Sequence, residues 1–421
     1  MSKTPHQPWY QRIGPGLITA CVVIGPGSVL ASSRVGAAEG YSRNWVVVVA
    51  MLCMVVYTSL AAKLGAATKQ SPGTLVAQRA GRWLSVAIGV SVFLIAGLFQ
   101  FGNNLGAHAA VREYAAVAGW ESVIAAGVLV ALNGLSLAFL FAFKDFYKAL
   151  ERLMMAFVGV MLLSFAVNLV LARPDLGALA AGFIPRATGR VDISVLGMIG
   201  TTFVVAAAFL QTYLVQQKGW GKEDVRRGLV DARIGAVILL LITLMIVSTS
   251  AAVFHDPASD QPVEFSGVGD VGQQLRPLLG DWGQFVFCLG LFSAAYSSFL
   301  VNSMAGGFLL SDGLGLGSKP EQRWPKILTA LLLLLGMFVA LAIVLLDFNV
   351  VPAIIIAQAI TVIASPLLAG VLLWLTNRPD IMGEDRNAPA MNIAAGLGFL
   401  LLLGVAYYTA AHAIPGTFAR W

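Results

Sequence analysis

The chain has 421 residues, of which 58% are hydrophobic and only 11% are charged, and its mean hydropathy is +0.81. A soluble domain of this length needs more polar surface, so the composition excludes a soluble enzyme or binding module and indicates a polytopic membrane protein. The net charge of +6 comes from basic residues in short segments between apolar runs. This distribution does not form a nucleic-acid-binding surface, and it instead sets the orientation of the chain in a lipid bilayer.

Apolar runs long enough to cross the hydrocarbon layer recur along the whole chain. We therefore expect an all-α membrane protein made of one transmembrane domain, 1–421, with no separate soluble domain. About eleven helices are expected to cross the membrane. The expected spans are 13–36, 44–65, 84–110, 122–143, 151–172, 193–216, 230–254, 283–310, 326–346, 351–376 and 391–412.

The basic residues predict which way the chain is inserted. With the N-terminus in the cytoplasm, 19 of the 27 Lys and Arg residues fall in inner segments and 8 fall in outer segments. Basic residues accumulate on the cytoplasmic side of membrane proteins, so we expect this orientation, in an inner (cytoplasmic) membrane of the bacterial kind. An odd number of spans then places the C-terminus on the extracytoplasmic side.

The first span contains a break, Gly25-Pro26-Gly27-Ser28. Proline has no amide donor, and glycine on either side weakens the remaining preference for helix. In lipid, freed backbone groups persist only where protein or a water-lined cavity satisfies them. The break therefore predicts a discontinuous helix with a binding site near the membrane midplane, which is typical of transporters.

The third span carries a polar stripe. Gln100, Asn104 and His108 are four residues apart and share a helix face, and Asn103 lies beside them. Buried polar groups of this kind either join helices by hydrogen bonds or line a substrate or proton path. His108 is the candidate proton carrier, because histidine titrates near neutral pH.

The sixth span contains Gly197, Gly200, Thr201 and Thr202, followed by the alanines 206–208. Small residues favour either an unwound segment facing the first break or close helix packing. In the eighth span, Ser297 and Ser298 carry hydroxyl oxygens suited to a hard cation such as Na⁺, although serines also allow tight packing. In the tenth span, Gln358 is isolated among apolar residues and is expected to point inward.

The sequence lacks the usual features of an enzyme. There is no nucleophile triad, no phosphate-binding loop and no Cys/His ligand cluster, so we expect no catalytic activity and no cofactor. The cysteines Cys21, Cys53 and Cys288 all fall in apolar spans, where they are expected to be small packing residues. The acidic residues lie toward span ends or in loops, and Asp231 is among them.

Three stretches of the sequence, within about 12–375, resemble the Nramp (natural resistance-associated macrophage protein) family of divalent metal transporters. The stretches are Gly14-Pro15-Gly16-Leu17 with Val35-Gly36-Ala37-Ala38-Glu39-Gly40-Tyr41; Ile199-Gly200-Thr201-Thr202-Phe203; and Gly290-Leu291-Phe292-Ser293-Ala294-Ala295-Tyr296-Ser297-Ser298 with Ala305-Gly306-Gly307. The resemblance implies a LeuT-type fold, with a first repeat at 12–172, an inverted second repeat at 193–376 and an extra helix at 391–412. It also implies transport by alternating access through a site between discontinuous spans one and six.

The resemblance does not extend to the family's metal ligands. The first-span motif Asp-Pro-Gly-Asn reads Gly25-Pro26-Gly27-Ser28 here, and the sixth-span Met-Pro-His motif begins at Val204. The residue that gives a backbone carbonyl ligand is Thr201. A histidine later in the sixth span aligns with Gln211. In the third span, the family's proton-linked acids align with Gln100 and Asn103.

The candidate substrate-binding residues are therefore Gly25, Gly27, Ser28, Thr201, Val204, Gln211 and Gln358, with no metal ligand among them. The candidate residues for a coupling ion or proton path are Gln100, Asn103, Asn104, His108, Ser297 and Ser298. Such a site would lack the charge and sulfur that favour transition metals, so a small organic solute, such as an amino acid or carboxylate, is slightly favoured. Hydrated Mg²⁺ or another divalent ion is the alternative, and a non-transporting membrane sensor is a third. We expect a monomeric symporter that uses Na⁺ or H⁺.

Overall fold

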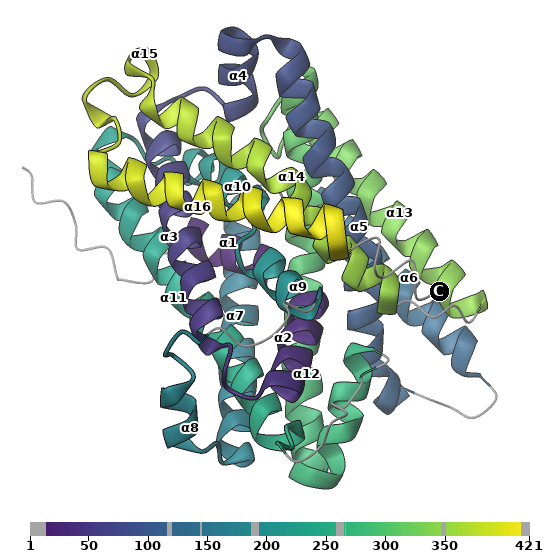
Figure 1. The fold of residues 1–421 in the computed structure, drawn as a ribbon. Helices are drawn as coiled ribbons and strands as arrows, with labels where there is room; N and C mark the ends of the chain where they lie inside the picture. The colour runs from purple at the N-terminus through teal and green to yellow at the C-terminus, as the bar shows by residue number, and fades with distance from the viewer. Residues whose placement is uncertain are drawn as a thin grey trace, which may run out of the picture.

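The structure is a computed structural model, and it describes residues 14–115, 120–143, 145–186, 193–257, 265, 267–346 and 351–413. Within these ranges the chain is helical, with short connections and no strand, as Figure 1 shows. The principal helices are α1 (Pro15–Val23), α2 (Pro26–Glu39), α3 (Asn44–Ala67), α4 (Pro72–Ala80), α5 (Arg82–Ala115), α6 (Glu121–Ala142), α7 (Phe146–Ala172), α8 (Leu176–Ala181), α9 (Ile193–Thr202), α10 (Val205–Gln217), α11 (Val225–Phe254), α12 (Val268–Leu314), α13 (Arg323–Leu346), α14 (Val351–Asn377), α15 (Pro379–Met382) and α16 (Pro389–Tyr408).

The described part of the chain has nine helices that are long and apolar enough to cross a membrane, and up to eleven if two bent pairs each count as one span. One pair is α1 with α2, and the other combines the second half of α14 with the short helices after it. The expectation of an all-α polytopic protein with about eleven spans is confirmed.

The first break lies where the sequence predicts it. Helix α1 ends at Val23, and Ile24 and Gly25 are extended before Pro26 begins α2. The two helices are bent by 61° at this point. Proline suits the first position of a helix, because its missing amide is not needed there, so Pro26 ends one helix and starts the next.

The sixth span is also broken, although it contains no proline. Helix α9 ends at Thr202 and α10 begins at Val205, with Val204 in an extended conformation. Phe203, which is 1% exposed, lies in the break with its ring centroid 5.3 Å from that of Tyr57 on α3. The local sequence does not force a break in this span, and the break is accompanied by the packing of Phe203 against α3.

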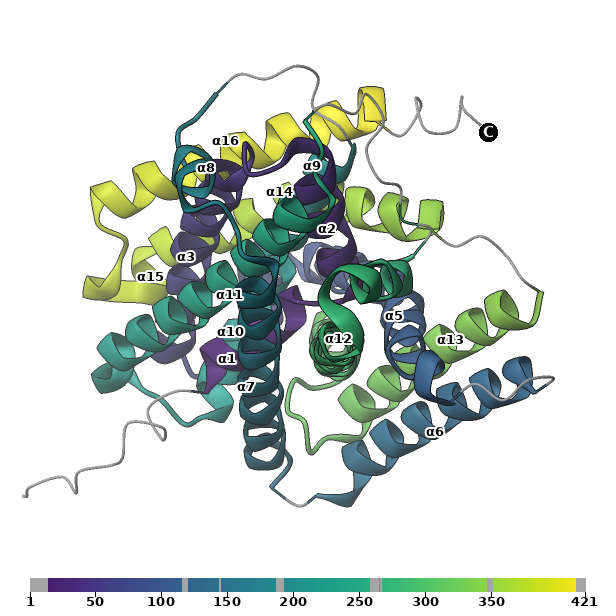
Figure 2. The same cartoon turned by 90° about the horizontal axis from the view of Figure 1, so that it is seen from below.

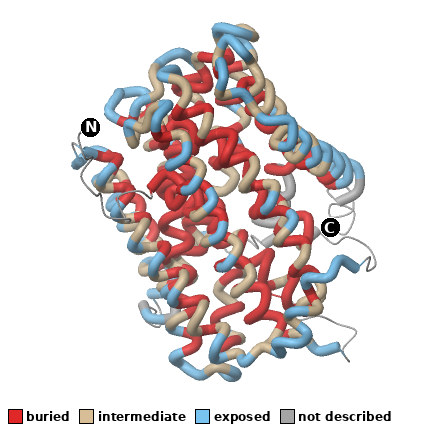
Figure 3. The backbone as a smooth tube through the Cα atoms, turned by 90° about the vertical axis from the view of Figure 1, so that its left-hand side faces the viewer, coloured by how far each residue is buried: buried red, intermediate tan, exposed pale blue. Residues whose placement is uncertain are grey.

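Each half of the first span packs against one half of the sixth span. Helix α1 packs on α10, and α2 packs on α9. Helix α12 passes through the middle of the bundle, where Figure 2 shows it end-on, and α5 runs along it. Helices α6 and α13 pack together on one flank, while α14 and α16 pack together on another. The buried residues form a continuous interior along this arrangement (Figure 3).

The eighth span is longer than expected. We placed it at 283–310, but α12 runs from Val268 to Leu314 and includes a kink at Gly280, whose φ is 75°. This left-handed conformation suits glycine, so a mixed polar and apolar segment before the expected span joins it as a separate helical piece. None of the three cysteines is in a disulfide, and Cys21 and Cys288 are buried, in agreement with a packing role.

The crossing of α1 and α11 depends on two glycines. A Cβ atom at Gly235 would clash with the backbone carbonyl of Gly16, and one at Gly16 would clash with the backbone of Asp231. The two main chains can approach this closely only without side chains at the crossing.

We predict that Gly235→Val destabilises the protein by about 1–3 kcal/mol, because the new side chain forces α1 and α11 apart. Thermal unfolding of the purified protein in detergent measures the effect. Gly127→Val on α6 is the matched control, because a Cβ at Gly127 meets no atom within 4 Å. Equal melting temperatures for the two variants would contradict the packing argument.

Candidate functional site

The first break lies directly against spans three and eight. A Cβ atom at Gly25 would lie 2.9 Å from the Ser298 Oγ on α12 and 3.1 Å from the Asn103 Oδ1 on α5. A Cβ at Gly106 of α5 would clash with the ring of Pro26. The structure therefore brings together Gly25, Asn103 and Ser298, which the sequence analysis assigned to two different roles.

Hydrogen bonds join the end of α1 to α12. The Ser298 hydroxyl and the Asn302 amide nitrogen both donate to the Val22 carbonyl, each at 3.3 Å. The same amide nitrogen donates to the Ser298 Oγ at 2.8 Å. Ser297 instead donates to Ala294 in its own helix, at 3.2 Å. Asn302 stands four residues after Ser298, and this spacing was the signal by which the sequence could have identified it.

The polar stripe of α5 forms a network that extends to α6. Gln100 donates to the Phe299 carbonyl at 3.1 Å, and Asn104 donates to the Gln100 carbonyl at 2.9 Å. Asn133 of α6 donates to the Asn104 Oδ1 at 2.6 Å. The Gln100 Oε1 and the Asn103 Nδ2 are buried without a hydrogen-bond partner in the described structure. Part of the stripe therefore joins helices, and Asn103, which lies beside Gly25, has an amide nitrogen without a partner in the described structure.

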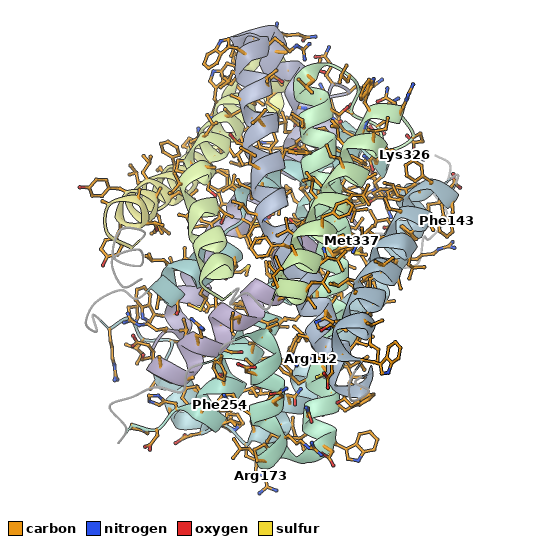
Figure 4. The ribbon with its side chains drawn as sticks, turned by 90° about the vertical axis from the view of Figure 1, so that its right-hand side faces the viewer. Arg112, Phe143, Arg173, Phe254, Lys326 and Met337 are labelled. Atoms are coloured by element: carbon orange, nitrogen blue, oxygen red, sulfur yellow. The ribbon has the colours of Figure 1, made fainter. Side chains whose placement is uncertain are left out.

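His108 lies one turn beyond Asn104 on α5 and is half-buried. The helix continues to Arg112, which lies in the same half of the molecule as Phe254 and Arg173 (Figure 4). His108 follows Gly106, which contacts Pro26, by two residues, and it therefore lies close to the break on the side toward Arg112.

The candidate residues of the sixth span separate into two places. Thr201 and Val204 flank the break and are buried, and the Thr201 hydroxyl donates to the Met198 carbonyl at 3.2 Å. Gln211 lies along α10 and is hydrogen-bonded to Thr19 of α1. Ser28 is buried in the first turn of α2, while Gly27 is half-buried. Gln358 belongs to α14, but its side chain lies outside the described structure.

Asp231 is a functional candidate that sequence reasoning missed. Its side chain is fully buried near the start of α11, and its two carboxylate oxygens accept hydrogen bonds from the Gly14 and Gly16 amides at 2.8 and 2.6 Å. These amides belong to the first turn of α1, where no intrahelical acceptor exists. The Gln211 amide also donates to Asp231, at 3.4 Å. Its position toward the helix end was predicted, but its burial against α1 was not.

A second polar contact lies beside this cap. Glu151 of α7 forms an ion pair with Lys218, which follows α10, and both side chains are largely buried. A Cβ atom at Gly14 would clash with the Glu151 carboxylate. Helices α1, α7, α10 and α11 are thus held together by charge at this end.

The chemistry available at the break is neutral. The groups around it are hydroxyls, side-chain amides and freed backbone atoms, and no three His, Cys, Asp or Glu side chains gather anywhere in the described structure to hold a metal ion. A dehydrated divalent cation is normally held by carboxylates or other strong ligands. The groups at the break are therefore hydrogen-bond donors and acceptors, together with the N-terminus of α2.

Two discontinuous spans packed half against half define a membrane transporter fold of the LeuT type. The fold is similar to the solved structure of MhsT in complex with L-phenylalanine, with a TM-score of 0.58 and 14% sequence identity. The match covers 96% of this chain and 100% of that chain. A structure of the Eremococcus coleocola manganese transporter is more similar, with a TM-score of 0.81 and 18% sequence identity. The match covers 99% of this chain and 90% of that chain.

The sequence comparison identifies the family. The family model for natural resistance-associated macrophage protein-like proteins matches residues 16–412, so the chain belongs to the Nramp family. The divalent metal cation transporter MntH of Deinococcus radiodurans is 29% identical over 380 residues, covering 88% of this chain and 83% of that protein. MntH of Chromohalobacter salexigens is 26% identical over 421 residues, covering 97% of this chain and 93% of that protein.

We predict that Asp231→Ala destabilises the protein by about 1–3 kcal/mol, because two buried amides of α1 lose their acceptor. Thermal unfolding in detergent measures the loss, and hydrogen exchange at the first turn of α1 should rise with it. Asp231→Asn keeps an acceptor oxygen and should lose less stability. The interpretation fails if Asp231→Ala melts at the wild-type temperature with unchanged exchange in α1.

Proposed function

We propose that this protein is a secondary active transporter that works by alternating access, with its substrate site between the breaks at Gly25 and Val204. The observation that carries the proposal is the pairing of the two discontinuous spans, α1 with α10 and α2 with α9. Halves of this kind can move relative to each other and expose a fixed site first to one side and then to the other. We also propose an inner membrane location with the N-terminus in the cytoplasm, on the distribution of basic residues.

For the substrate, we favour a small organic solute such as an amino acid or carboxylate. The position of the family's aspartate is Gly25, and the groups facing it are the Ser298 hydroxyl and the Asn103 amide oxygen. No carboxylate of the described structure hydrogen-bonds in this group of residues. The first turn of α2, with the Gly27 and Ser28 amides, offers hydrogen-bond donors and a positive helix end to an anionic group.

The second candidate is a divalent ion, and the relatives favour it. The curated relatives are named divalent metal cation transporters, and the Eremococcus coleocola structure is that of a manganese transporter. Magnesium keeps several water molecules when it binds, so hydroxyl and amide oxygens could contact it through its hydration shell.

For coupling, the two candidates are a proton at His108 and Na⁺ near Ser297 and Ser298. We favour the proton, because Ser297 hydrogen-bonds within its own helix and Ser298 is joined to Asn302 and Val22. His108 is the titratable residue of the α5 stripe, and it lies one turn from Asn104 on the helix that carries Asn103 to the break.

Uptake into liposomes that contain the purified protein tests the substrate. We expect uptake of a member of a panel of amino and carboxylic acids, and little uptake of Mn²⁺. If a proton gradient drives this uptake through His108, the His108→Ala variant should lose its pH dependence. Rapid Mn²⁺ uptake that is lost in Thr201→Ala or Ser28→Ala would overturn the organic-solute proposal, while Mg²⁺ uptake alone would support the alternative.

We predict that restoring the family's ligands creates a metal site. The triple variant Gly25→Asp, Ser28→Asn and Val204→Met supplies a carboxylate, an amide oxygen and a thioether at the two breaks. Isothermal titration of the purified variant with Mn²⁺ should show binding at least tenfold tighter than that of the wild type. The variant with Gly25→Asn in place of Gly25→Asp adds similar bulk without charge, and equal Mn²⁺ affinity in the two variants would contradict the prediction.

A further inference from the structure

The carbonyl of Val22 is left without a helical partner by the sequence itself. In a continuous helix it would accept a hydrogen bond from the residue four positions later, which is Pro26. Proline has no amide hydrogen, so this acceptor must find a partner elsewhere. It lies inside the bundle, where an unsatisfied carbonyl is costly.

The partners that it finds come from α12. The Ser298 hydroxyl and the Asn302 amide both donate to the Val22 carbonyl at 3.3 Å, and the Ser298 Oγ accepts from the same amide at 2.8 Å. Ser298 and Asn302 are 1% and 6% exposed, so water does not compete freely for these groups. Since both neighbours of the Asn302 nitrogen are oxygens, the amide is oriented with its NH₂ group toward them.

This arrangement has the form of a cation site with a different occupant. A carbonyl oxygen and a hydroxyl oxygen on facing helices are ligands for hard cations. A cation bound by the Val22 and Ser298 oxygens would have to lie between them, close to the point where the Asn302 nitrogen lies. The amide supplies partial positive charge there, fixed to the protein and independent of any ion.

The main chain at Gly25 lies close to the bridge. A Cβ atom at Gly25 would approach the Ser298 Oγ to 2.9 Å and the Asn103 Oδ1 to 3.1 Å, which is tighter than ordinary contact. A carboxylate at position 25 would therefore disturb Ser298, while glycine leaves the bridge intact. The loss of the acidic residue at Gly25 and the presence of the amide at Asn302 are compatible parts of one neutral junction.

We infer that Asn302 is a specificity-determining residue, a built-in neutral bridge that takes the place of a bound cation between α1 and α12. It makes the closure of this junction independent of Na⁺ and of divalent metal ions, and it excludes both from the oxygens of Val22 and Ser298. The consequence for transport rests on the proposed function, but the bridge itself can be tested without transport.

The test is the thermal stability of the purified protein in Na⁺, choline and Mn²⁺ at matched ionic strength. We expect the wild type to melt at the same temperature in all three. Asn302→Asp replaces the donor by a carboxylate oxygen of nearly the same shape and creates a site with charge, so Na⁺ or Mn²⁺ should raise its melting temperature by on the order of a few degrees over choline.

The matched control is Asn168→Asp on α7. Asn168 is 1% exposed, and its amide donates only to the Ser164 carbonyl of its own helix in the described structure, so this variant buries a carboxylate away from the break. A second variant, Asn302→Ser, removes the donor without adding charge and should show a smaller effect of Na⁺ than Asn302→Asp. It covers the case in which Asn302→Asp does not fold.

Two results would overturn the inference. One is a wild-type protein that Na⁺ or Mn²⁺ already stabilises, with the effect lost in Ser298→Ala. The other is an Asn302→Asp protein that responds to ions no more than Asn168→Asp does, together with no response in Asn302→Ser. Failure of solute uptake with a normal ion response in these variants would count against the proposed function and leave the bridge standing.

Discussion

The missing amide of Pro26 is the constraint on which the rest of this structure depends. It ends α1, starts α2 and leaves the Val22 carbonyl without a helical donor in a region that water does not supply. Two helices that contact the break accommodate this constraint. Helix α12 provides donors from Ser298 and Asn302, and α5 provides the small Gly106 against which the proline ring can lie.

The two ends of α1 are held by different physical means. At its start, the buried carboxylate of Asp231 accepts from the Gly14 and Gly16 amides, which is a charge-assisted cap. At its end, neutral hydroxyl and amide groups satisfy the carbonyl of Val22. A short helix of nine residues is marginal by itself, so these two contacts and the crossing at Gly235 define its position. Helix α1 is therefore a separate piece with its own attachments to α11 and α12.

Much of this fold could be predicted from the sequence, because long apolar runs and a Pro-Gly break have few solutions in a membrane. The second break was harder to predict, because the helix is interrupted at Phe203 and Val204 without a proline. The ring of Phe203 packs there against Tyr57, which is distant in the sequence. The site was only partly predictable. The spacing of Gln100 and Asn104 gives one helix face, but the pairing of Asn104 with Asn133 depends on how α5 and α6 meet. The sequence shows Asp231 only as an acidic residue near the end of a helix. Its role as a cap depends on the packing of α1 against α11.

The cap at the start of α1 also bears on how such a protein can change over time. Asp231 bonds α1 through the main-chain amides at Gly14 and Gly16, two positions where close packing leaves no room for a side chain. The attachment of the helix to the scaffold therefore places few demands on the side chains farther along it. Substitutions near the break can then accumulate while the half-helix stays anchored at its start.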